Sequence, residues 1–313
     1  MDACPKRKGL RQLHCARLLC NAMQKLSRAL RQRALCQRWA TSDSAQSAES
    51  SRARNRAQFE QQAEPFAAVP AHADGIEQLL DAGGVQAGRS VLDVACGPGL
   101  VSLAAAARGA RVTGVDVTLA CVATAQASAR AAGYSAATAS FLVAPAERLP
   151  FADASFDLAL CRYALHHLTP AQQVAAVSEM ARVVVGGGRI LLADVAIADA
   201  AHAEAYDELE RIRDSSHAGV VRGGGSGMAA LLLGAGLTRW ADRCYTYPFT
   251  ASAESIVAAS FPDKEAGRAE WLSILRTEGP PGRLGIQVSL TGQGIRYAVP
   301  IAVEVATKAP ASV

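Results

Sequence analysis

The fold is decided by the stretch Val91-Leu92-Asp93-Val94-Ala95-Cys96-Gly97-Pro98-Gly99. An apolar run that stops at an acid and opens into glycines predicts a buried strand and a tight loop, with residues 100–108 as the following helix. Gly97 and Gly99 lack a Cβ, so they can adopt positive φ and let a ligand lie against the backbone. Free N–H groups at the start of the helix complete a nucleotide-type site at the carboxyl end of a strand.

The next strand, residues 111–117, indicates which nucleotide the site binds. It contains Asp116, nineteen residues after Gly97, the spacing of a carboxylate that binds ribose hydroxyls. The dinucleotide fingerprint requires a third glycine where this chain has Ser102, and Asp93 places a carboxylate where an anionic pyrophosphate would lie. A carboxylate suits a ligand with an ammonium and a sulfonium group, so the charge favours S-adenosylmethionine (SAM) over NAD.

Further segments follow in a fixed order, at residues 146–151, 155–157, 164–168 and 182–192. With these segments the chain resembles the class I SAM-dependent methyltransferases, in the ubiquinone/menaquinone C-methyltransferase (methyltransferase type 11) branch. The resemblance covers roughly residues 57–310. It implies a Rossmann-like, doubly wound α/β fold with a seven-stranded sheet, an antiparallel last strand and helical lid insertions. The last two strands are expected at 238–247 and 294–307, and a glycine turn at 186–188. The segments that carry the resemblance are the Asp116 strand end, 146–151 with 155–157, 164–168 and 182–192.

The same resemblance implies SAM as the cofactor and assigns its binding residues. Relatives read G-D-A-E-x-L-P-F where this chain has Pro145 in place of the acid that accepts the adenine amino group, so weaker SAM binding than in close relatives is expected. The methionine end is assigned to Asp93, Ala95, Gly97 and Gly99, the ribose to Asp116 and Val117, the adenine to Ala146 and Glu147, and the surroundings of the methyl group to Cys161.

The segment after the fourth strand carries the candidate chemistry. It lacks the [N/D]-P-P-[F/Y] run common in enzymes that methylate amino nitrogens, which disfavours that reaction. His166 is the candidate catalytic base, because histidine titrates near neutral pH; the alternative is that it packs the loop. Only one of two adjacent helical residues is expected to face the pocket, so His167 is expected to pack the loop. Tyr163, Arg213 and His217 are the expected substrate residues, and no metal site is expected.

These features predict SAM-dependent transfer of a methyl group to carbon or oxygen of a small, hydrophobic or aromatic acceptor. One alternative is a catalytically weak SAM-fold subunit with a binding or scaffold role, for which Pro145 is the hint. Another is a nicotinamide oxidoreductase, which Ser102 and Asp93 disfavour.

The charge of the chain is unevenly distributed along its length. Residues 1–56 hold 13 of the 32 Lys and Arg but three of the 28 Asp and Glu, which leaves 19 basic and 25 acidic residues in 57–313. An acidic catalytic region is poorly suited to gripping a phosphate backbone, so nucleic acid is disfavoured as a partner. No apolar run is long enough to span a bilayer, and the oligomeric state stays open.

The basic leader, 1–56, has the Arg-rich, acid-poor composition of an organelle transit peptide. A disordered tail and an upstream extension are the alternatives. A cleaved leader would indicate a mitochondrial or plastid protein, and otherwise a cytoplasmic one. Residues 57–313 are expected to form the methyltransferase domain, with a substrate lid at about 199–235 and 250–285. The eight cysteines include no C-x-x-C pair, which favours free thiols in a reducing compartment.

Overall fold

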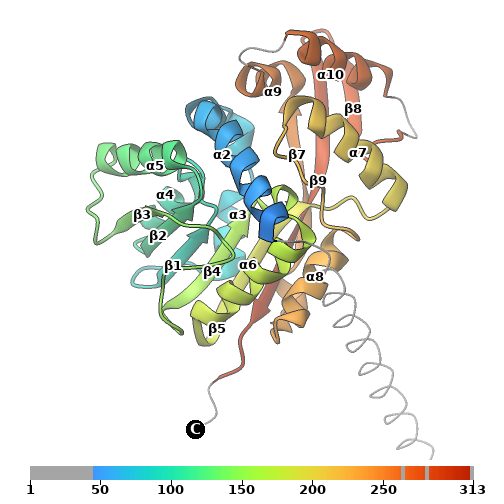
Figure 1. Cartoon of the computed structure of the whole chain (residues 1–313). Helices are drawn as coiled ribbons and strands as arrows, with labels where there is room; N and C mark the ends of the chain where they lie inside the picture. Colours follow the sequence, from blue (N-terminus) through green and yellow to red (C-terminus); the bar gives the residue numbers. More distant parts are fainter. Residues whose placement is uncertain (1–44, 262–264, 279–281, 311–313) are drawn as a thin grey trace, which may run out of the picture.

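The computed structural model describes residues 45–261, 265–278 and 282–310. Within these residues nine strands form one sheet in the order β3-β2-β1-β4-β5-β9-β6, with β7 and β8 also paired to β9 (Figure 1). β1 to β5 are parallel, and β9 runs antiparallel to β5, which confirms the expected doubly wound α/β fold. The strands are β1 (Ser90–Val94), β2 (Arg111–Asp116), β3 (Ala139–Val143), β4 (Phe156–Arg162), β5 (Val184–Val195), β6 (Thr238–Arg239), β7 (Tyr245–Ser252), β8 (Gln287–Thr291) and β9 (Gly294–Thr307).

Helices cover both faces of the sheet, because successive side chains of a strand point to opposite faces. Val91 of β1 joins the apolar core on one face, and Leu92 joins the core on the other. Both strand faces are therefore buried, as is usual for parallel strands. The first face is covered by α3 (Ile76–Gly83), α4 (Leu100–Ala107) and α5 (Leu119–Ala131), and the second by α6 (Pro170–Val183) and α8 (Gly225–Gly234).

A third apolar core lies above the sheet, where β7, β8 and the first half of β9 extend beyond the parallel strands (Figure 1). Trp271 and Phe261 are completely buried there. Helices α7 (Ala200–Arg213), α9 (Ala253–Ser260) and α10 (Glu265–Thr277) surround this core. These helices fall largely within the segments expected to form the lid.

The local predictions differ from the structure in two places. The strand expected at 238–247 is divided into β6 and β7 by a short 3-10 turn, η3 (Ala241–Arg243), and β8 was not expected. The expected turn at 186–188 lies inside β5, which begins at Val184. Gly187 adopts a positive φ of 80°, and the β4–β5 register shifts at this point, so the glycines make an irregularity within the strand.

Helix α2 (Ala45–Ala67) crosses in front of the sheet and contacts α5 and α9 (Figure 1). It begins N-terminal to the domain boundary expected at residue 57. Ser51 and Asn55 are buried, and both side chains donate hydrogen bonds of 3.3 Å to the carbonyl oxygen of His167. Residues 1–44 of the expected leader lie outside the described residues. In the described part of the chain, no helix combines the length and apolarity needed to cross a membrane.

Candidate active site

The loop after β1 exposes bare backbone to a cavity. Ala95, Gly97 and Gly99 have φ values of 57°, 53° and 91°. A Cβ on Gly97 would meet no atom within 4 Å, and Gly97 lines the cavity. Gly99 does not line it, because a Cβ there would lie 3.0 Å from the Ala125 Cβ on α5. Gly99 therefore allows α4 and α5 to approach each other, and the structure does not place it at the cofactor position expected for it.

Asp116 joins this loop to the end of β2. One carboxylate oxygen accepts a hydrogen bond from the Gly97 N–H and the other from the Thr118 N–H, both at 2.9 Å. Burial raises the pKa of Asp116, and these hydrogen bonds oppose the rise. Each carboxylate oxygen keeps a lone pair free, so the group can still accept hydrogen bonds from two ribose hydroxyls.

Asp93 lies at the same end of the cavity. It is 3% exposed and accepts a 2.6 Å hydrogen bond from the Ser102 hydroxyl. Burial raises the pKa of Asp93 to about 7. A cationic ligand would favour the ionised form of this carboxylate, so the site is suited to an ammonium group.

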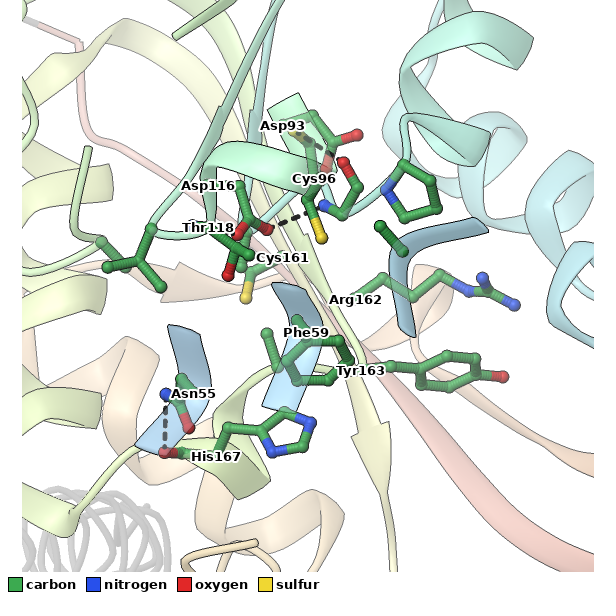
Figure 2. Close-up of a pocket in the computed structure, with 18 of the residues that line it drawn as sticks. Asn55, Phe59, Asp93, Cys96, Asp116, Thr118, Cys161, Arg162, Tyr163 and His167 are labelled. Atoms are coloured by element: carbon green, nitrogen blue, oxygen red, sulfur yellow. Dashed lines mark hydrogen bonds between the residues drawn. The ribbon is translucent and has the colours of Figure 1, made fainter. Parts of the chain in front are cut away.

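The cavity encloses about 1090 Å³ including its open mouth. Figure 2 shows Asp93, Cys96 and Asp116 gathered at one end and His167 at the other, with Phe59 of α2 between them. Every expected cofactor residue except Gly99 lines this cavity, namely Asp93, Ala95, Gly97, Asp116, Val117, Ala146, Glu147 and Cys161.

Glu147, which was expected to contact the adenine, is anchored at the cavity wall. Its Oε1 accepts hydrogen bonds from Arg52 at 3.0 Å and from the Gln172 amide at 2.5 Å, so α2 and α6 fix the carboxylate against the cavity wall. The Ala146 N–H donates to no group in the described part of the chain. A free N–H beside an anchored carboxylate can pair with a ring nitrogen and an exocyclic amino group, which are the two groups that an adenine presents.

A second cavity of about 770 Å³, its open mouth included, adjoins the first, and both are lined by Phe59, Phe66, Tyr163 and His167. The expected substrate residues Tyr163, Arg213 and His217 all line it, as does His166. Aromatic rings form much of its wall. Phe66 stacks on His72 with ring centroids 3.7 Å apart, and His72 stacks on Phe249 at 5.7 Å.

His166 forms a pair with Asp194 at the end of β5. Its Nδ1 lies 2.6 Å from Asp194 Oδ1, and the carboxylate also accepts the N–H groups of Leu165 and Val195 at 2.7 Å. Burial lowers the pKa of His166, but the Asp194 carboxylate outweighs it, so this pKa lies above its ordinary value. Because Nδ1 donates to Asp194, Nε2 is the nitrogen left to accept a proton.

His167 lines both cavities and His166 lines the second, so the expectation that only one of the two histidines can face the site was wrong. The two histidines lie on the 3-10 turn η2 (Leu165–His167), which is tighter than an α-helix. Burial lowers the pKa of His167, and its Nδ1 lies 3.0 Å from the Ser216 hydroxyl, which donates to Asp214. His167 is therefore held in place by Ser216.

Tyr163 contributes its ring to both cavities. Its hydroxyl shares a 2.8 Å hydrogen bond with Tyr247, and the Arg162 guanidinium lies 4.0 Å from the ring centroid. Burial raises the pKa of Tyr163. This residue is therefore a fixed wall between the cavities and not a proton acceptor.

Sequence reasoning missed Asp194, which supports His166, and several residues that line the two cavities. Asp194 lies near the end of a buried strand, a position that can signal a site residue in a doubly wound fold. The others lie on α2, α7, β7 and β9 and on the 3-10 turn before α3, and carry no motif. They are Arg52, Asn55, His72, Tyr206, Glu210, Phe249 and Tyr297.

Gly97→Ala is expected to weaken SAM binding at least about tenfold, because the new methyl group would project into the cavity. The positive φ adds a strain of about 1–2 kcal/mol to the free protein. Gly133→Ala is the matched control, since Gly133 also has positive φ and open space but lines neither cavity. Titration calorimetry and thermal unfolding of both variants separate the two effects. Equal SAM affinity in the two variants would contradict the assigned role of Gly97.

Comparison with known proteins agrees with this geometry. Residues 91–188 match the methyltransferase domain family. The chain is 35% identical over 166 residues to the uncharacterized methyltransferase YcgJ of Bacillus subtilis, covering 52% of this chain and 64% of YcgJ. It is 38% identical over 115 residues to the demethylmenaquinone methyltransferase of Beutenbergia cavernae, covering 37% and 44% of the two chains. The matched region thus spans less than two thirds of either relative.

Solved structures share the fold. The YcgJ crystal structure superposes with a TM-score of 0.64 at 25% identity, covering 76% of this chain and 98% of YcgJ. A geranyl diphosphate methyltransferase in complex with SAM, 14% identical, has the same fold with a TM-score of 0.54 over 75% of this chain and 85% of its own. Residues 91–188 therefore carry a methyltransferase domain within a class I SAM-dependent methyltransferase fold, with SAM as the cofactor.

Proposed function

We propose that this protein transfers the methyl group of SAM to an oxygen or carbon atom of a small, neutral, aromatic or apolar acceptor bound in the second cavity. The observation that carries the proposal is that the two cavities adjoin and share lining residues. The cofactor cavity lies beside an aromatic-walled space that is lined by His166, whose Nδ1 pairs with Asp194. SAM, when bound, supplies an electrophilic methyl group on a sulfonium.

His166 then acts as the general base. Asp194 holds the Nδ1–H, so Nε2 accepts the proton of an acceptor hydroxyl or of an activated carbon. The acceptor atom forms a bond to the methyl carbon while the carbon–sulfur bond breaks, and the electron pair of that bond goes to sulfur. The proton stays on His166 and is later lost to solvent, so charge and atoms balance.

The cavity walls align the acceptor and exclude water from it. Cys161 is 3% exposed, and burial raises the pKa of its thiol, so it presents a neutral surface. Phe59 and Tyr163 lie at the junction of the cavities and fix the direction from which an acceptor approaches. Alignment of a nucleophile with the methyl group supplies much of the rate in such transfers.

The scaffold and oxidoreductase alternatives are less well supported. The scaffold hypothesis rests on Pro145, but Glu147 and the free Ala146 N–H lie at the same end of the cavity. A nicotinamide dinucleotide would place its pyrophosphate against Asp93, whose carboxylate would repel it.

The test is a turnover assay of the full chain with SAM and a panel of phenols, hydroquinones and apolar carbon acids. The expected result is S-adenosylhomocysteine and a methylated acceptor in equal amounts, detected by mass spectrometry. The acceptor-free reaction is the control. Tight SAM binding with no product from any member of the panel would contradict the proposal and favour the scaffold hypothesis.

A further inference from the structure

The end of the second cavity formed by α7 and β9 contains two tyrosine hydroxyls without a partner. Tyr206 and Tyr297 are each 5% exposed and line the cavity. Neither hydroxyl makes a hydrogen bond in the described part of the chain, and neither oxygen is fully enclosed, unlike the hydroxyl of Tyr245. Buried tyrosine hydroxyls usually have a partner, so these two are arranged for a group that a ligand supplies.

The rings of these tyrosines are held in place. The Trp271 ring packs edge-on against Tyr297 with centroids 5.7 Å apart, and Trp271 is completely buried. Tyr206 packs edge-on against His217 at 6.4 Å, and His217 is bound to Asp207 by a 2.8 Å hydrogen bond. The hydroxyls therefore have little freedom to find other partners.

The charges around this cavity disfavour an anionic ligand. The guanidinium of Arg213 is paired with Glu210 and donates a 3.3 Å hydrogen bond to Ser260, so its charge is already compensated. Asp214 adds a second carboxylate to the wall. The carboxylates of Glu210 and Asp214 would repel a carboxylate of the acceptor. They would not repel a neutral hydroxyl or carbonyl oxygen.

We propose that the acceptor is a neutral molecule with two polar ends, and that Tyr206 and Tyr297 select it by binding a hydroxyl or carbonyl oxygen opposite the atom that is methylated. The His166–Asp194 pair serves the reacting end, and the stacked rings of Phe66, His72 and Phe249 contact the ring between the ends. This inference rests on the proposed function, because it names the acceptor class of that transfer.

The test measures binding of three ring probes to the full chain saturated with S-adenosylhomocysteine. The probes are hydroquinone, 4-methylphenol, in which a methyl group replaces the distal hydroxyl, and 4-hydroxybenzoate. The distal hydroxyl of hydroquinone can form two neutral hydrogen bonds, to Tyr206 and Tyr297, that 4-methylphenol cannot form. We therefore expect hydroquinone to bind roughly tenfold more tightly than 4-methylphenol. In the double variant Tyr206→Phe/Tyr297→Phe this ratio should fall to about one, with 4-methylphenol binding unchanged. Tyr134→Phe is the control, since Tyr134 lines neither cavity.

Three results would overturn the inference. Hydroquinone and 4-methylphenol could bind equally well to the wild type, or the difference in their affinities could survive in the double variant. The third is that 4-hydroxybenzoate binds most tightly of the three probes. Titration of S-adenosylhomocysteine into the same samples separates the two proposals. If S-adenosylhomocysteine binds but the wild type binds hydroquinone and 4-methylphenol equally, the acceptor inference fails and the transfer proposal stands. If S-adenosylhomocysteine does not bind, the proposed function fails, and the acceptor inference fails with it.

Discussion

His166→Asn is expected to lower kcat about 100- to 10,000-fold and to leave the dissociation constant of SAM unchanged. The asparagine keeps a polar side chain beside Asp194 but cannot take up a proton. SAM binding should be unaffected, because His166 lines the second cavity, where the acceptor is proposed to bind, and does not line the cofactor cavity. His202→Asn is the matched control, since His202 is half-exposed on α7 and lines neither cavity.

The pH dependence of kcat/KM gives an independent test of this pair. Asp194 raises the pKa of His166 above 6.5 and outweighs the effect of burial, so kcat/KM should rise with pH through an inflection above 6.5. Asp194→Asn removes the charge that raises the pKa. The inflection should then move to lower pH while the maximum rate falls, because the imidazole becomes a weaker and less well oriented base.

Two outcomes would contradict the assigned role of His166. One is full activity of His166→Asn with the acceptor used by the wild type. The other is an inflection that stays in place in Asp194→Asn. The first would mean that alignment drives the transfer without this base, and the second that the titrating group is not His166.

Asp116→Ala is expected to weaken SAM binding about 100- to 10,000-fold. The substitution removes two hydrogen bonds from ribose hydroxyls to a charged acceptor, each of which contributes about 1.5–3 kcal/mol. It also frees the N–H groups of Gly97 and Thr118, so the loop after β1 loses its anchor. Isothermal titration with SAM measures the change.

Asp157→Ala is the control for this experiment. Asp157 also accepts a backbone hydrogen bond, from Ser90 at 2.9 Å, but it lies at the other end of β1 and lines neither cavity. This variant should lose stability without losing SAM affinity. Unchanged affinity in Asp116→Ala would mean that the carboxylate anchors the loop and does not touch the cofactor.

The cofactor side of the site could be predicted from the sequence because its parts are local. A strand, a glycine loop and the acid of the next strand have fixed spacings, so Asp93, Gly97 and Asp116 were identified and line one cavity. Gly99 was assigned to SAM from the same spacing, but it lies against α5 and does not line the cavity. Its position depends on how α4 and α5 pack, which the sequence pattern of the loop does not reveal.

The acceptor side depends on contacts between distant segments. Tyr206 lies on α7 and Tyr297 on β9, and they meet because β9 extends past the parallel strands into the third core. Neither residue belongs to a motif. Helix α2 is a similar case, since Asn55 reaches a carbonyl 112 positions away. The expected boundary at residue 57 followed the change in charge, which says nothing about such a contact.

Calorimetric titration of the full chain with SAM and, separately, with NADH tests the central claim most directly. The account predicts one SAM site per chain, with a dissociation constant on the order of micromolar, and no binding of NADH. Binding of NADH without binding of SAM would contradict it, because Asp93 and Asp116 would then face a pyrophosphate instead of the methionine and ribose of SAM.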